Sequence, residues 1–118
     1  MTHIPQGIRS IIRRANNYNP DVLLRAESLA LQAMRPFWVN LDRVLRCRGI
    51  SYREYERMMK YYGFPVKRES ISSAVKGHFS RFSFTYLCAC ADVLGYTYAD
   101  LYSGIFHPHD VRCMQEQE

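Results

Sequence analysis

Apolar positions recur at intervals of three and four residues along most of the 118-residue chain. This spacing is typical of amphipathic α-helices, because residues three and four apart lie on one face of a helix. Strand-like alternation never extends beyond four residues, and no hairpin dipeptide occurs. The pattern therefore predicts an all-α fold, a compact bundle of five to six helices.

The first part of the chain carries clear signals for where helices start and stop. A short basic helix is expected at residues 8–15, within an N-terminal arm of residues 1–19. Asn19-Pro20-Asp21 then supplies a helix N-cap, a proline at the first helical position and an acid near the positive end of the helix dipole. Pro36 is expected to end this helix, because an interior proline removes a backbone hydrogen bond. A separate helix is expected at residues 37–47.

Capping residues and glycines delimit the later helices. Ser51-Tyr52-Arg53-Glu54 has the pattern of a capping box, and Gly63 and Gly77 are suited to end two short helices. Ser83 can cap a further helix and Thr97 a last turn. The side chains expected to face inward from these helices are Tyr55, Met58, Met59, Tyr62, Ile71, Ala74, Val75, Phe84, Leu87, Ala91 and Leu94.

The helical pattern fades towards the C-terminus. Residues 20–106 are expected to form a single helical domain, since a chain of this length has room for about one core. Residues 107–118 are expected to be a loosely ordered tail, because the segment from Pro108 lacks a periodic apolar pattern.

Charge is distributed unevenly. Residues 1–82 hold fifteen Lys or Arg against six Asp or Glu, a net charge of +9, whereas residues 83–118 have a net charge of −4. Clustered positive charge is what a polyanionic partner requires. A basic surface can also serve only to keep a small protein in solution.

Residues 51–77 are the informative stretch, because two short helices joined by a turn, with amphipathic helices on both sides, are typical of a helix-turn-helix. The N-terminal part of the second helix enters the DNA major groove in that motif. The residues expected to read base edges are Lys67, Arg68, Ser70, Ser72 and Ser73. Arg68 is best placed for a guanine contact, although the turn at Pro65 leaves Lys67 or Ser72 as alternatives.

Polar residues at the edges of the motif are expected to contact the sugar-phosphate backbone, which positions a protein without reading sequence. These expected phosphate contacts are Arg53, Lys76, His78, Ser80 and Arg81. Serines and basic side chains of this kind can instead solvate an exposed helix face.

From Leu41 to Leu101 the chain resembles the Cro and phage-repressor class of helix-turn-helix domains. The matching elements are Arg48-Gly49-Ile50-Ser51, Gly63, Ile71, Lys76-Gly77, the helix from Ser83 to Leu94, and Tyr98-Ala99-Asp100-Leu101. Three features depart from the class: a first motif helix longer by about one turn, a longer turn through Phe64-Pro65-Val66, and Glu56 where a small residue is usual. The resemblance implies a DNA-binding regulator that is bacterial or encoded by a mobile element such as a phage.

Residues 37–95 are also similar to an uncharacterised bacterial domain family of this general shape. The shared positions are Trp38, Ser51-Tyr52-Arg53-Glu54, Gly63, Glu69 with Ile71, and Lys76-Gly77-His78-Phe79-Ser80. This similarity implies the same fold and a DNA-binding role without adding a mechanism.

Catalytic and metal chemistry find little support. His107, His109 and Cys113 look like metal ligands, but a structural zinc site needs a fourth ligand and usually a second close pair. No Gly-rich phosphate loop or Cys-His signature occurs. We therefore expect no metal, no cofactor and no enzymatic activity.

The four cysteines are expected to be reduced, since no signal peptide precedes them and Cys88 and Cys90 are too close on a helix to pair well. Apolar runs are too short to span a membrane. The sequence thus points to the cytoplasm, in association with the nucleoid.

Two functions remain open. A duplex-DNA regulator would use residues 51–81 to read DNA, and a helical protein-interaction module, such as a phage or plasmid adaptor or inhibitor, would use its nine tyrosines as a partner surface. A homodimer is expected for the regulator, because helix-turn-helix domains commonly bind two half-sites. The apolar stripe expected at that interface comprises Val22, Leu23, Ala26, Leu29, Ala30 and Ala33.

Overall fold

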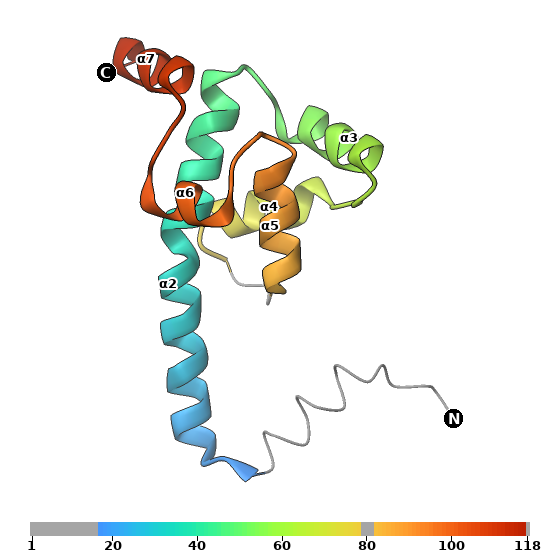
Figure 1. The fold of residues 1–118 in the computed structure, drawn as a ribbon. Coiled ribbons are helices and arrows are strands. Elements are labelled where there is room, and N and C mark those ends of the chain that lie inside the picture. The colour runs from blue at the N-terminus through green and yellow to red at the C-terminus, as the bar shows by residue number, and fades with distance from the viewer. Residues whose placement is uncertain (1–16, 79–81, 118) are drawn as a thin grey trace. The chain divides into compact units, whose positions relative to one another are not determined.

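The computed structural model describes residues 17–78 and 82–117. Its helices are α2 (Pro20–Cys47), α3 (Tyr52–Tyr62), α4 (Arg68–Val75), α5 (Phe84–Asp92), α6 (Tyr98–Ser103) and α7 (Pro108–Gln117) (Figure 1). No strand occurs in these two ranges, which confirms the all-α class. None of the helices described combines the length and the apolar character needed to cross a membrane. The helix expected at residues 8–15 lies outside the described residues.

The chain divides into two units, residues 1–33 and residues 34–118. In the first unit, α2 begins as expected: Asn19 Oδ1 accepts a hydrogen bond from the Asp21 backbone N–H at 2.9 Å, and Pro20 is the first helical residue. The apolar stripe expected here is largely exposed. Val22 is 63% exposed and Leu29 54% exposed.

The second unit shows that Pro36 does not end the helix, because α2 continues through it to Cys47. An interior proline costs a helix about 3 kcal/mol. Phe37 and Trp38 follow directly and are buried, with 0% and 3% of their surface exposed. Each large side chain contributes about 2 kcal/mol or more on burial, which is enough to offset the proline. The two helices predicted around Pro36 are therefore one.

The core of the second unit draws on all its helices. Its apolar side chains with no exposed surface are Phe37, Leu41 and Val44 from α2, Tyr55 and Met59 from α3, Ile71 from α4, Cys90 and Ala91 from α5, and Leu101 from α6. Leu45 of α2 and Met114 of α7 are also buried in this core. The Tyr55 hydroxyl donates a 2.6 Å hydrogen bond to the Cys90 backbone oxygen, so this buried polar group is satisfied.

Two side chains predicted to face inward do not. Tyr62 is 45% exposed and its hydroxyl donates to Asp92 Oδ2 at 2.5 Å, so it bridges α3 and α5 at the surface. Phe84 is 64% exposed and packs edge-on against Tyr98, with ring centroids 4.9 Å apart. The periodicity placed these residues near the apolar face, but both lie at the ends of their helices, where the core no longer covers them.

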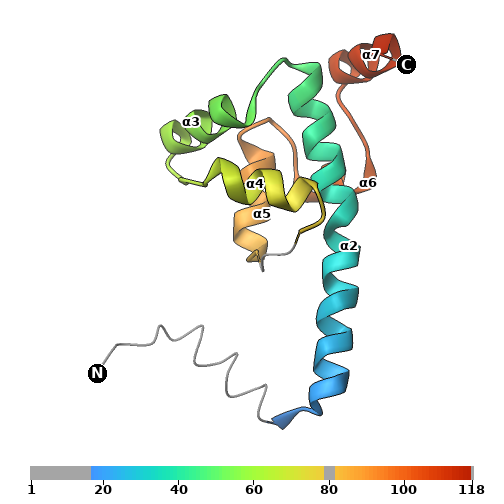
Figure 2. The same cartoon turned by 180° about the vertical axis from the view of Figure 1, so that it is seen from behind.

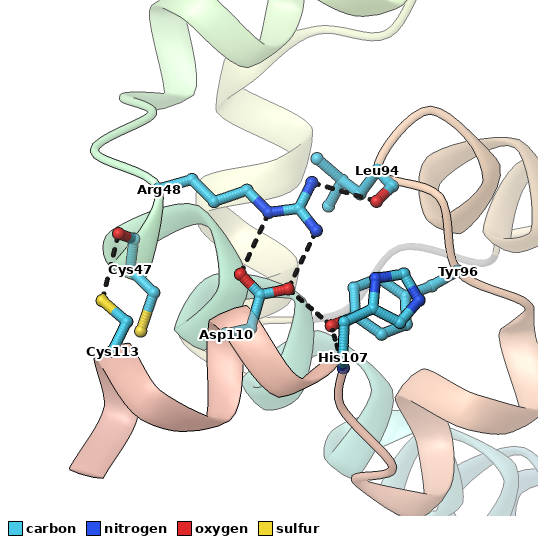
Figure 3. A network of polar contacts seen from close by, with 7 residues as sticks. All are labelled: Cys47, Arg48, Leu94, Tyr96, His107, Asp110 and Cys113. Atoms are coloured by element: carbon cyan, nitrogen blue, oxygen red, sulfur yellow. Dashed lines mark hydrogen bonds and ion pairs between the residues drawn. The ribbon is translucent and has the colours of Figure 1, made fainter.

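The C-terminal segment is a helix, so the expected loosely ordered tail is wrong. Asp110, in the first turn of α7, is buried and receives two hydrogen bonds from Arg48, from Nε at 3.2 Å and Nη2 at 2.8 Å (Figure 3). The Tyr96 hydroxyl donates to the same carboxylate at 2.5 Å, and the His107 backbone N–H donates to Tyr96 Oη at 2.7 Å. Met114 is buried one turn further along. This network fastens α7 to the end of α2.

Candidate nucleic-acid interface

The boundaries of α3 confirm the predicted caps. The Ser51 hydroxyl accepts a hydrogen bond from the Glu54 backbone N–H at 3.1 Å. At the other end Gly63 has φ +101°, a left-handed conformation that favours glycine, and its N–H bonds to the backbone oxygens of Met59 and Lys60. The turn from α3 towards α4 therefore begins at Gly63.

The start of α4 is held by a residue of α3. Lys67 occupies the N-cap position but makes no side-chain capping bond. The Arg68 backbone N–H instead donates to Glu56 Oε2 at 2.7 Å. A carboxylate at this position satisfies a free helix N–H and complements the positive end of the helix dipole. Glu56, which departs from the repressor-class pattern, thus fixes α3 against the start of α4.

The end of α4 is held by a residue of α2. Arg35 Nη1 donates a 3.0 Å hydrogen bond to the backbone oxygen of Val75, the last helical residue. Gly77 follows with φ +82°, and a methyl group there would overlap the Arg35 guanidinium. Each end of this eight-residue helix therefore contacts a charged side chain from another helix. The carboxylate of Glu56 faces the positive end of the helix dipole, and the guanidinium of Arg35 faces the negative end.

The two faces of α4 differ as predicted. Ile71 and Ala74 are buried, and Val75 is half-buried. On the other face a hollow of about 420 Å³ opens between α3 and α4, which lie beside each other in Figure 2. The residues that line it are Tyr52, Arg68, Glu69, Ser72 and Ser73.

The structure gathers three of the five predicted reading residues. Arg68, Ser72 and Ser73 line the hollow, whereas Lys67 and Ser70 do not, although Lys67 is exposed at the helix start.

Arg68 and Glu69 form an exposed ion pair beside the hollow, with Arg68 Nε 3.4 Å from Glu69 Oε1. A hydrogen bond to its own backbone and the contact with Arg68 hold the pKa of Glu69 below its usual range. Exposed pairs of this kind contribute little to stability, so Arg68 can exchange its partner at small cost.

No family model, curated protein or solved structure matches the chain. The resemblance to the repressor class therefore stays a prediction.

The predicted phosphate contacts lie at both edges of the motif. Arg53 is exposed in the first turn of α3, and Lys76 and His78 are exposed after α4. Ser80 and Arg81 lie outside the described residues.

Two further basic residues were missed from the sequence. Arg57 and Lys60 are exposed on α3 and follow Arg53 at the i+4 and i+7 positions, so the three share one face of the helix. Glu56 lies three residues after Arg53 and four before Lys60, and it contacts the start of α4. The basic face of α3 therefore adjoins the first turn of α4. The spacing from Arg53 was the signal that could have identified both residues.

Tyr52 links the hollow to α2. Its hydroxyl donates to Asp42 Oδ1 at 2.7 Å, and the other Asp42 oxygen pairs with Arg46 Nε at 2.7 Å. Burial, with the hydrogen bond to Asp42, raises the pKa of Tyr52 to about 12. The ring is therefore a fixed, uncharged wall of the hollow at neutral pH.

Two of the three residues that resembled metal ligands, His107 and Cys113, make structural contacts, and His109 is exposed on α7. The His107 ring stacks on Tyr96 with centroids 3.9 Å apart, and the Cys113 thiol donates to the Cys47 backbone oxygen at 3.2 Å. Within residues 17–78 and 82–117, no three His, Cys, Asp or Glu side chains are grouped in a way that could hold a metal ion.

Proposed function

We propose that the chain is a duplex-DNA-binding transcription regulator that uses α3 and α4 as a helix-turn-helix. The observation that carries this proposal is the junction of the basic face of α3 with the polar face of α4 around the contact between Glu56 and Arg68. Clustered cations bind phosphates, and a short polar helix beside them can read base edges.

Under this proposal α4 lies in the major groove, which admits one helix. Ile71 and Ala74 stay packed on the core, while Ser72 and Ser73 are short enough to let the backbone approach the bases. Arg68 exchanges its contact with Glu69 for the O6 and N7 acceptors of a guanine, the commonest base contact of arginine. Arg53, Arg57, Lys60 and Lys76 contact phosphates on either side.

The regulator is further proposed to act as a homodimer at the bacterial nucleoid. Two half-sites about 34 Å apart are typical of helix-turn-helix dimers. The exposed apolar side chains of Val22 and Leu29 on α2 support a contact with a second copy. Sedimentation that finds a monomer at tens of micromolar, with and without DNA, would remove the dimer from the proposal.

Binding to random duplex DNA across a salt series tests the proposal. The affinity of the wild-type chain should fall steeply with salt, because phosphate binding releases counterions. Lys76→Ala and Arg57→Ala should weaken binding to all sequences and each lower the slope of log affinity against log salt by about 1. Arg112→Ala, which removes an exposed arginine from α7, is the matched control and should change neither.

Base reading needs a separate readout. Arg68→Ala should cost about 1 to 3 kcal/mol on a site selected from random duplexes and relax discrimination at one base pair, with little effect on random duplex. A wild-type chain that binds no duplex at low salt would contradict the proposal.

A protein-interaction module is the second candidate, favoured by a row of exposed rings. Phe84 contacts Tyr98, which stacks on Tyr102 with centroids 5.8 Å apart, and Phe84 and Tyr102 are both exposed. Aromatic side chains of this kind are enriched at protein interfaces. Such an adaptor need not bind DNA, so the salt series distinguishes the two functions.

A further inference from the structure

Cys47 and Cys113 meet where α2 ends and α7 packs against it (Figure 3). The Cys113 thiol donates to the Cys47 backbone oxygen at 3.2 Å. The Gln117 side chain contacts both sulfurs: its Oε1 lies 3.7 Å from Cys47 Sγ and its Nε2 lies 4.0 Å from Cys113 Sγ. Both cysteines are free and half-buried, so the pair is close together and open to a small reagent.

The segments that carry the two cysteines are held together by contacts that do not involve the sulfurs. Arg48, the residue after Cys47, binds Asp110, which lies three residues before Cys113 on the same face of α7. Met114 is buried on that face as well. Because a disulfide forms only between cysteines whose backbones are already at the right separation, this anchoring favours pairing without refolding.

We propose that Cys47 and Cys113 are a thiol–disulfide exchange site that closes into an intramolecular disulfide when the chain meets a small-molecule disulfide oxidant such as oxidised glutathione. The bond would join α2 covalently to α7 and enclose residues 48–112. Neither the DNA-binding proposal nor the adaptor alternative depends on it.

The exchange takes two steps. Burial and the neighbouring Cys113 raise the pKa of the Cys47 thiol to about 11, so Cys47 stays protonated at neutral pH. The Cys113 sulfur gives up its proton and attacks the oxidant, whose S–S bond breaks and releases one thiol. Cys47 then gives up its proton, its sulfur attacks Cys113, and the second oxidant thiol leaves. Two protein thiols are oxidised and one oxidant disulfide is reduced to two thiols.

The other two cysteines are internal controls. Cys90 is fully buried in the core, and burial raises the pKa of its thiol to about 12. Cys88 lies two residues away on the same helix, a spacing unsuited to a disulfide. Neither should pair.

The test equilibrates the full chain in mixtures of oxidised and reduced glutathione, blocks free thiols with an alkylating agent, and maps peptides without reduction. The expected result is one linked pair of peptides, containing Cys47 and Cys113, in the wild type and in Cys88→Ser. Oxidised wild type should melt about 10 °C or more above reduced wild type, because the closed loop is long. Oxidised Cys113→Ser should melt at the temperature of its reduced form.

Three outcomes would overturn the proposal. One is a glutathione adduct on Cys113 without the internal bond, another is a link that includes Cys88 or Cys90, and the third is a covalent dimer. Peptide mapping of the wild type decides among these even if a substituted chain folds poorly.

Discussion

The short helices α4 and α7 are both anchored by charged side chains from other helices, but in opposite environments. Glu56 and Arg35 hold the two ends of α4 at the surface. Asp110 holds α7 from inside, where only 1% of its surface is exposed and Arg48 and Tyr96 satisfy its carboxylate. The helix proposed to meet a polyanion is thus fixed by charged side chains at the surface, and the helix remote from that role by a fully buried carboxylate paired with a half-buried arginine.

The difference teaches what each anchor can do. Removing one partner of a buried ion pair is strongly destabilising, because the charge that remains is poorly compensated by solvent. A surface carboxylate on a helix start contributes less and is weakened by salt. The α7 anchor should therefore dominate stability, and the α4 anchors should set the geometry of the candidate site.

The largest expected effect comes from breaking the buried anchor. Asp110→Asn should lower the free energy of unfolding by about 3 kcal/mol, because the half-buried Arg48 guanidinium loses its counter-charge. Urea denaturation followed by circular dichroism measures this loss. Glu116→Gln, an exposed acid of the same helix, is the matched control. Equal stability of both variants would show that α7 is not held by this network.

Acid should remove the same contribution in the wild type. Hydrogen bonds from Arg48 and Tyr96 hold the pKa of Asp110 below its usual range. Because the folded pKa is lowered, the stabilisation is complete above the unfolded pKa of about 4 and is lost as pH falls through the folded pKa. The difference in urea midpoint between wild type and Asp110→Asn should therefore shrink below about pH 4. A difference that stays constant down to pH 2 would contradict the assignment.

The anchor at the start of α4 should matter less. Glu56→Ala should cost about 1 kcal/mol, a typical value for a lost helix cap. Glu116→Ala should cost almost nothing. Repeating the measurement in 1 M salt should reduce the Glu56 effect and leave the Asp110 effect unchanged, since buried pairs are screened much less. If the stability loss of Glu56→Ala did not change with salt, the contrast between the two anchors would be wrong.

The smallest effect is expected at the other end of α4. Arg35→Ala removes a cation from the helix C-terminus and should cost about 0.5 kcal/mol. Arg112→Ala, in a helix where this arginine makes no such contact, serves as the control. Thermal melts of the two variants at low salt would separate them, and an identical pair of melts would assign Arg35 no capping role.

Local signals made most helix boundaries predictable. Ser51, Gly63, Ser83 and Thr97 act on backbone groups within a few residues, so the sequence alone locates those ends. Pro36 was misinterpreted because the burial that carries the helix through it depends on distant residues. The helix α7 was missed for a related reason: its inward face combines one apolar residue with a buried acid, which no hydrophobic period records.

In the candidate site, too, local features were predictable from the sequence and contacts between distant residues were not. Arg68, Ser72 and Ser73 were identified because one short helix displays them together. The contacts of Glu56 and Arg35 with α4 cross 12 and 40 residues of sequence, which is why spacing alone did not predict them. A clue existed at Lys67, which cannot cap a helix and so required a cap from elsewhere.

The proline inside α2 divides one helix into two stretches with separate hydrogen-bond ladders. Pro36 has no N–H to donate to the carbonyl of Gln32, so one backbone hydrogen bond is missing between the exposed N-terminal part of α2 and its buried C-terminal part. Amide protons at residues 41–47 should exchange with solvent only when the core opens, whereas those at residues 24–33 can exchange through local fraying. A single unbroken helix would then contain two independently opening segments, separated by one imino acid.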